Sequence, residues 1–171
     1  MRLQNFSRVR VSELVINWHV LEACNYHCRY CFAKWEKPAH PELWRSSENS
    51  KRLLEALWDF FDPANSENPL RRFMEWKRLR LSLAGGEPTL LGARLVDIAR
   101  KAHHLGFSVS LISNGSRLDS ERVQELAPLL SVIGLSLDAV DPATNVAIGR
   151  DYRGECLDID RIVSIVDTPR R

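Results

Sequence analysis

Three cysteines lie close together in the chain: Cys24, Cys28 and Cys31, with the spacing C-x3-C-x2-C. Thiolates this close suit three corners of a cuboidal iron–sulfur cluster. No fourth cysteine lies nearby in the sequence, so a fourth iron would keep an open position. A metal with an open position can bind and activate a ligand, whereas a fully ligated cluster serves to move electrons. The spacing therefore predicts a cluster that takes part in catalysis.

Other uses of these thiols stay open at this point. Cysteine and imidazole ligands also suit zinc, and His27 or His19 would complete such a site. Zinc motifs usually come as two distant pairs, however, and the sequence has no second pair. A disulfide framework is not favoured, because it needs an even set of cysteines in a secreted chain, and residues 1–11 lack the apolar stretch of a signal peptide. Unrelated thiols are the third alternative.

The hydrophobic periodicity alternates between strands and helices. Strands are predicted at 14–21, 79–83, 107–112 and 132–137, and helices from a cap at Ser46 or Ser47 to about residue 61 and at 91–105, 119–129 and 157–166. A loop is predicted at 62–69, where proline and asparagine are frequent. This alternation is typical of an α/β fold with a parallel sheet.

The polar motifs follow the predicted strands. The cysteine loop, Gly85-Gly86, Ser113-Asn114 and Ser136 with Asp138 each come after one of them. Parallel strands joined by right-handed crossovers place their carboxyl ends along one edge, where barrel-type α/β enzymes build their active sites. The motifs are therefore expected to meet in space.

These motifs, in this order, resemble the radical S-adenosylmethionine (SAM) enzymes. The resemblance is carried by C-x3-C-x-Φ-C with Tyr30 at the aromatic position, by Gly85-Gly86-Glu87-Pro88 and by Ser113-Asn114-Gly115. It implies a partial (β/α) barrel with about four of the six usual strand–helix units. It also implies one 4Fe-4S cluster on the three cysteines and SAM bound at the open iron.

The same resemblance implies residues for SAM. Tyr30 would pack near the adenine, and Gly85 and Gly86 would let the backbone approach the methionyl amino group. Ser113 and Asn114 would hydrogen-bond the ribose or the carboxylate. The implied set is Tyr30, Gly85, Gly86, Glu87, Ser113 and Asn114.

Residues 14–150 are similar, more narrowly, to the viperins, through the segment from Ser136 to Asp141 and through N-x-x-I-G-R at 145–150. This resemblance implies dehydration of a nucleoside triphosphate to a 3′-deoxy-3′,4′-didehydro nucleotide in antiviral defence. It implies an electron donor of the reductase, flavodoxin or ferredoxin type, and leaves CTP, UTP and GTP open as substrates. Lys34 is near enough in sequence to the cluster to reach a triphosphate, and a solvated lysine is the equal alternative. The implied substrate residues are Asn17, Arg80, Ser82 and Arg150.

The chain departs from the viperin pattern in two respects. It ends after about four strand–helix units, so one radical SAM core domain, 1–171, is expected to lack its usual C-terminal part and to have room for a complementing chain. Residues 151–160 are partly acidic where viperins are basic, which would repel a triphosphate. Another radical SAM enzyme, such as a peptide maturase, and an inactive cluster-binding remnant therefore remain alternatives.

Charge and composition limit the remaining classes. The net charge of +2 gives no strong field for long nucleic acid, and no apolar run approaches a membrane span. A reduced, oxygen-poor cytoplasm fits exposed cluster thiolates, so a cytoplasmic protein is expected. Several basic residues lie close together between positions 71 and 80. They fit either the binding of a phosphorylated small molecule or a solvated loop, and they are Arg71, Arg72, Lys77, Arg78 and Arg80. Cys156 is expected to be a buried small hydrophobic residue, and His19 a barrel residue with a satisfied side chain.

Overall fold

Four parallel strands form one sheet in the order β1-β2-β3-β4. The computed structural model describes residues 8–33 and 41–168. The strands are β1 (Val9–Leu21), β2 (Met74–Gly85), β3 (Ser108–Ser113) and β4 (Val132–Leu135). Neighbouring strands pair in parallel, with Asn17 opposite Ser82 and Leu81 opposite Val109. The predicted α/β class with a parallel sheet is confirmed.

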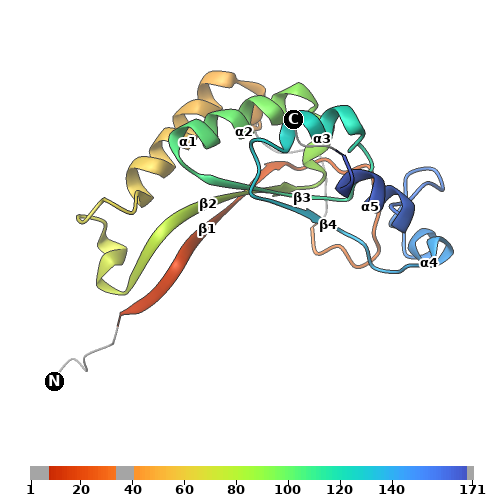
Figure 1. The fold of residues 1–171 in the computed structure, drawn as a ribbon, viewed down its shortest axis with the longest axis horizontal. Coiled ribbons are helices and arrows are strands. Elements are labelled where there is room, and N and C mark those ends of the chain that lie inside the picture. Colours follow the sequence, from red (N-terminus) through yellow and green to blue (C-terminus); the bar gives the residue numbers. More distant parts are fainter. Residues whose placement is uncertain (1–7, 34–40, 169–171) are drawn as a thin grey trace.

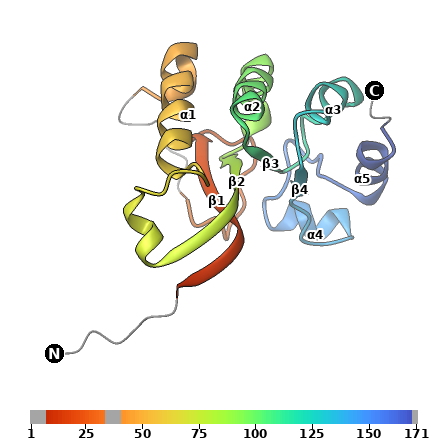
Figure 2. The ribbon, with the colours of Figure 1, turned by 60° about the vertical axis from the view of Figure 1, so that its left-hand side comes forward.

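Three helices lie one after another along one face of this sheet (Figures 1 and 2). They are α1 (Ser47–Phe61), α2 (Ala93–Leu105) and α3 (Ser120–Leu126). Two further helices, α4 (Pro142–Ala147) and α5 (Ile159–Val166), follow β4. Short 3-10 turns are η1 (Leu43–Arg45), η2 (Pro69–Arg72) and η3 (Pro88–Leu91). No helix among the described residues has the length and apolar character needed to cross a membrane.

The two faces of the sheet differ in chemistry. Leu79, Leu81 and Leu83 of β2 are buried in a core with Leu95 and Ile98 of α2. Because side chains alternate along a strand, the residues between these leucines point to the other face. We call this second face the open face. It carries Glu13, Val15, Asn17 and His19 of β1 opposite Arg78, Arg80, Ser82 and Ala84 of β2.

The strand β2 begins five residues earlier than its apolar pattern predicts. Residues 74–78 are mostly polar or aromatic, but their backbone pairs with β1, with Val9 opposite Met74 and Glu13 opposite Arg78. The backbone ladder therefore extends past the apolar stretch. The structure also contains α4, where no helix was predicted. Asp141 caps this short helix by accepting hydrogen bonds from the N–H groups of Ala143 and Thr144.

Gly106 ends α2 with a φ of +106°, in the left-handed region that glycine adopts readily at helix ends. A Cβ on Gly106 would lie 2.6 Å from Cη2 of Trp58, whereas a Cβ on Gly154, at a φ of +86°, would meet no atom within 4 Å. Alanine at either position costs roughly 1–2 kcal/mol of backbone strain. Gly106→Ala should lose about 1–3 kcal/mol more than Gly154→Ala, because it also overpacks Trp58. Urea unfolding of the two variants measures this difference, and equal losses would contradict it.

Candidate active site

A hollow of about 240 Å³ lies at the carboxyl edge of the sheet. Its walls come from four separate segments: the cysteine loop after β1, the Gly-Gly turn after β2, the end of β3 and the residues after β4. The lining residues of interest are Cys24, Cys28, Tyr30, Cys31, Gly85, Gly86, Ser113, Asn114, Ser136 and Arg150. The expected convergence of these motifs is thus present in the structure.

The three cysteines of the loop are free thiols with different exposure. Cys24 and Cys28 are half-buried and Cys31 is exposed. All three also line a second hollow of about 230 Å³, together with His27. The Cys31 N–H donates to the carbonyl oxygen of Cys28 at 3.1 Å, and this turn places the last two thiols. Burial raises the pKa of the Cys24 thiol, while a hydrogen bond from the Tyr26 N–H to its sulfur opposes the change.

The loop is held from the far side by the segment Ile148–Arg150. The His27 N–H donates to the Gly149 carbonyl at 3.1 Å, and the Arg29 N–H donates to the Ile148 carbonyl at 3.0 Å. Gly149 has a φ of +77°, and a Cβ there would lie 2.3 Å from the carbonyl oxygen of His27. Only glycine allows this approach. The I-G-R segment therefore supports the backbone that carries the cysteines.

The turn Gly85-Gly86 holds the other end of the cysteine loop. The Gly86 N–H donates to the Leu21 carbonyl at 2.7 Å, and the Glu87 N–H donates to the Ala23 carbonyl at 2.9 Å. A Cβ on Gly86 would lie 2.0 Å from the Ala23 carbonyl oxygen, so no larger residue fits. The family resemblance implied a bound ligand as the only reason for these glycines. The structure adds a second reason, which is the close packing of the two backbones.

Glu87 does not line the hollow but lies beneath its wall, with only 1% of its surface exposed. One carboxylate oxygen accepts from the hydroxyls of Thr89 and Ser113, at 2.5 and 2.8 Å, and from the Thr89 N–H at 2.9 Å. The other oxygen accepts from the Asn114 N–H at 2.7 Å. A buried carboxylate needs such donors to offset its lost hydration. Glu87 thereby joins the turn after β2 to the end of β3.

Asn114 is fixed on both sides. Its side-chain N–H donates to Asn25 Oδ1 at 3.0 Å, and its Oδ1 accepts from the Ser116 N–H at 2.9 Å. The Asn25 amide also donates to the Ser116 hydroxyl at 2.9 Å. These contacts connect the cysteine loop to the end of β3 by side chains alone. Asn25 had no predicted role, although its place next to Cys24 was a usable signal.

Tyr30, Asp138 and Arg150 form a cluster at the rim of the hollow. The Tyr30 hydroxyl donates to Asp138 Oδ2 at 2.5 Å and accepts from the Arg150 Nε–H at 2.7 Å. The Arg150 guanidinium also pairs with Asp138 and donates to the Ser136 carbonyl at 3.2 Å. Burial raises the pKa of Tyr30, and the positive charge of Arg150 opposes this. Asp138 was expected at this edge of the sheet, where the motifs meet, but no role of its own was predicted for it.

The other predicted substrate residues lie on the open face rather than in the hollow. Asn17 and Ser82 are opposite each other, and the next pair toward the carboxyl edge, His19 and Ala84, includes Ala84 of the hollow. One such step is roughly 7 Å along the strands. Arg80 Nε lies 2.7 Å from Glu13 Oε2, but in the described part of the chain this buried N–H makes no aligned hydrogen bond. Arg80 is thus paired by charge with an unpredicted neighbour.

Three remaining candidates have different outcomes. Lys34 lies outside the described residues. Cys156 is half-buried rather than buried, so its expected place in the core is wrong. His19 is exposed on the open face and does take part in an interaction. Within residues 8–33 and 41–168, no three His, Cys, Asp or Glu side chains gather around a point as a single ion would require.

A family model described as the Radical SAM superfamily matches residues 18–158. This match covers most of the chain and includes every segment that lines the hollow. The chain belongs to the radical SAM superfamily. The predicted family is therefore confirmed, and the family implies one 4Fe-4S cluster and SAM as cofactors.

Curated relatives add a narrower similarity. The chain is 39% identical over 158 residues to a protein from Pseudoalteromonas ulvae, covering 91% of this chain and 50% of the relative. It is 36% identical over 154 residues to one from Fibrobacter sp. (strain UWH6), covering 90% and 42%. Both relatives are named S-adenosylmethionine-dependent nucleotide dehydratase. This radical SAM chain spans about half the length of these relatives.

Solved structures show the same fold. Streptococcus suis SuiB matches with a TM-score of 0.57 at 20% identity, over 90% of this chain and 29% of that one. SuiB bound to S-adenosylmethionine matches with a TM-score of 0.55 at 21% identity, over 90% and 28%. At this identity the likeness concerns the fold alone. It confirms a partial radical SAM fold for the described strands.

The residues present fit the cofactors of a radical SAM enzyme. The donor set is three free thiols on one loop, at the wall of the hollow. The fourth cysteine of the chain does not line that hollow. Three thiolates without a fourth ligand leave one iron of a cluster open, and binding them requires loss of their protons.

Glu87→Gln tests whether this carboxylate supports the site. The amide would keep one acceptor oxygen but would turn an N–H group toward the Asn114 N–H or toward the hydroxyls, which leaves buried donors unpaired. A loss of roughly 1–3 kcal/mol of unfolding free energy is expected, with weaker retention of iron. Glu121→Gln, on the exposed surface of α3, is the matched control and should change neither value. Equal behaviour of the two variants in urea unfolding and iron analysis would contradict the role given to Glu87.

Proposed function

We propose that this chain is the radical SAM core of a nucleotide dehydratase that acts on a nucleoside triphosphate. The product would be the 3′-deoxy-3′,4′-didehydro nucleotide, used in antiviral defence. The observation that carries the proposal is the position of Asn17, Arg80 and Ser82 on the open face, next to the hollow at the cysteines. The similarity to relatives named nucleotide dehydratase supports the same reaction.

Cys24, Cys28 and Cys31 would hold the cluster. When bound and reduced, the cluster and SAM supply a 5′-deoxyadenosyl radical. The protein's own contribution is to bind and orient. Gly85, Gly86, Ser113 and Asn114 would contact SAM at the wall of the hollow, and Tyr30 would pack at its rim. Glu87 would act as a positioning residue, since its oxygens are already occupied by donors from η3 and the end of β3.

The open face would hold the nucleotide. A guanidinium presents a fork of donors that suits phosphate, and the Arg80 Nε–H has no aligned acceptor among the described residues. Asn17 and Ser82 would contact the ribose or the base, one step from the hollow. Arg150 would close the site from the rim, where it contacts Tyr30 and Asp138. The described chain would act as one domain, reduced by a donor of the reductase, flavodoxin or ferredoxin class.

The reaction is tested anaerobically with the chain reconstituted with iron and sulfide. SAM and reductant are added, and 5′-deoxyadenosine is measured without nucleotide and with CTP, UTP or GTP in turn. Stimulation by one triphosphate, with a dehydrated nucleotide as product, is the expected result. Cys28→Ala should lose the cluster absorbance and all 5′-deoxyadenosine, because a cluster corner loses its ligand. Cys156→Ala, outside the hollow, is the matched control and should keep both.

The other outcomes of this experiment separate the alternatives. SAM cleavage that no nucleotide stimulates, with a dehydrated product never formed, would overturn the dehydratase and leave another radical SAM enzyme. A cluster that forms but never cleaves SAM would leave a cluster-binding chain without activity.

Arg80→Ala tests the phosphate role. The expected result is a rise in the KM for the triphosphate of about tenfold or more, since a hydrogen bond to a charged group contributes roughly 1.5–3 kcal/mol. Cluster content and SAM cleavage without nucleotide should stay the same. Arg78→Ala removes the same charge from the same strand and face, but Arg78 is mostly exposed, with its Nε 3.9 Å from Glu13, so it should change the KM little. Arg80→Lys should restore part of the affinity, and equal effects of the two alanine variants would contradict a specific role.

A further inference from the structure

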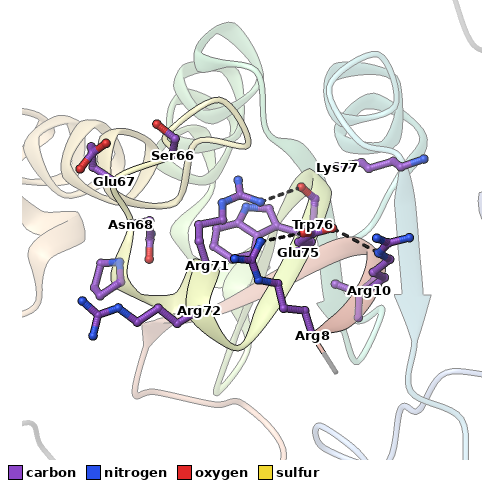
Figure 3. A pocket seen from close by; sticks show the side chains of 12 residues that line it. Arg8, Arg10, Ser66, Glu67, Asn68, Arg71, Arg72, Glu75, Trp76 and Lys77 are labelled. Atoms are coloured by element: carbon purple, nitrogen blue, oxygen red, sulfur yellow. Dashed lines mark hydrogen bonds and ion pairs between the residues drawn. The ribbon is translucent and has the colours of Figure 1, made fainter. Parts of the chain in front are cut away.

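Another cavity, of about 630 Å³, lies far from both hollows at the cysteines. It is at the other end of the sheet, near the start of β1 and β2 (Figure 3). It shares no lining residue with the hollow at the cysteines. About 3.3 Å per residue along β1 places Arg10 roughly 36 Å of strand from Leu21, where the cysteine loop begins. The reaction proposed above therefore does not use this cavity.

The cavity has a strongly positive lining. Five of its residues are cations and two are carboxylates; the cations are Arg8, Arg10, Arg71, Arg72 and Lys77. The net charge of this lining exceeds the +2 of the whole chain. Positive charge concentrated in this way within one concave surface attracts anions.

The floor of the cavity is rigid. The Arg71 guanidinium stacks on Trp76, 3.7 Å from the ring centre. It donates to the carbonyl oxygens of Pro63 at 2.6 Å and of Asp62 and Trp76 at 3.3 Å. The Trp76 indole N–H donates to the Phe61 carbonyl at 2.8 Å, and Figure 3 shows the stacked pair in the middle of the cavity. Carbonyl oxygens orient Arg71 but do not cancel its charge.

The rim keeps cations that the protein does not neutralise. Arg8 and Arg10 share the single carboxylate of Glu75, at 3.2 and 3.3 Å. The side chains of Arg72 and Lys77 are exposed and form no hydrogen bond or ion pair with any described residue. The rim therefore carries positive charge on both sides of the stacked Arg71–Trp76 pair.

We infer that this basic cavity is a separate ligand site for a polyphosphate anion. Arginine forks match phosphate oxygens in pairs, and several phosphates in one chain balance several cations at once. The cavity volume falls within the range of roughly 300–1,000 Å³ typical of small-molecule sites, which favours a small polyanion over an extended acidic protein surface. Inorganic tripolyphosphate and the phosphate chain of a nucleotide share this chemistry.

The test follows the Trp76 indole resonance in the cluster-loaded chain labelled with 15N-tryptophan and titrated with inorganic tripolyphosphate. The expected result is a saturable shift of the Trp76 signal, assigned with Trp76→Phe. Arg72→Glu with Lys77→Glu should weaken binding by about tenfold or more, because two charge-assisted contacts become repulsive. Arg94→Glu with Arg100→Glu changes the net charge equally on the exposed side of α2 and should weaken binding by less than about twofold, since distant exposed charges are screened.

The readout needs no turnover, so its failure is independent of the failure of the proposed dehydratase. A nucleoside triphosphate that binds more tightly than tripolyphosphate would identify a nucleotide ligand, and equal affinities would identify the phosphate chain as the whole determinant. No saturable shift at millimolar tripolyphosphate would overturn the inference. Equal weakening in both double variants, or a response to polyglutamate but not to tripolyphosphate, would overturn it as well.

Discussion

The buried carboxylate of Glu87 joins the ends of β2 and β3, and the geometry of the whole site depends on it. Its charge lies almost entirely out of water, so it must be compensated by donors, and all the donors come from η3 and from Ser113 and Asn114. The Ser113 hydroxyl donates its hydrogen bond to Glu87 and accepts one from the Gly115 N–H. What Ser113 presents to the hollow is thus limited by Glu87. The acidic residue of the Gly-Gly-Glu-Pro motif acts here by orienting other groups.

The cysteine loop has little core of its own and is held by neighbouring backbones. Leu21 and Ala23 accept from the Gly-Gly turn on one side, and the I-G-R segment pairs with His27 and Arg29 on the other. Both contacts need a glycine, because a Cβ on Gly86 or Gly149 would overlap a carbonyl oxygen. These contacts place the three thiols at the hollow.

The sequence predicted the elements whose signal is local and missed what depends on distant partners. The apolar stretches predicted the sheet and the main helices. The early start of β2 was missed because its polar residues are held by pairing with β1, which no local pattern reveals. The three motifs predicted the site, since strand order alone brings the carboxyl ends together. The pairs Glu13–Arg80 and Asp138–Arg150 join residues more than ten positions apart, and nothing in their neighbourhoods indicates the pairing.

These two ion pairs bear on how a nucleotide would bind. Arg80 and Arg150 are each already paired with a carboxylate, so a triphosphate would exchange one acceptor for another rather than meet free cations. The binding free energy gained in such an exchange is only the difference between the two interactions. The released carboxylate then lies near the bound triphosphate and repels it. Specificity can come from geometry, because the poorly aligned Arg80 gains more from a well-placed phosphate than the multiply bonded Arg150 does. The same carboxylates keep both side chains in place before substrate arrives. We therefore expect the open face to favour selective binding over tight binding.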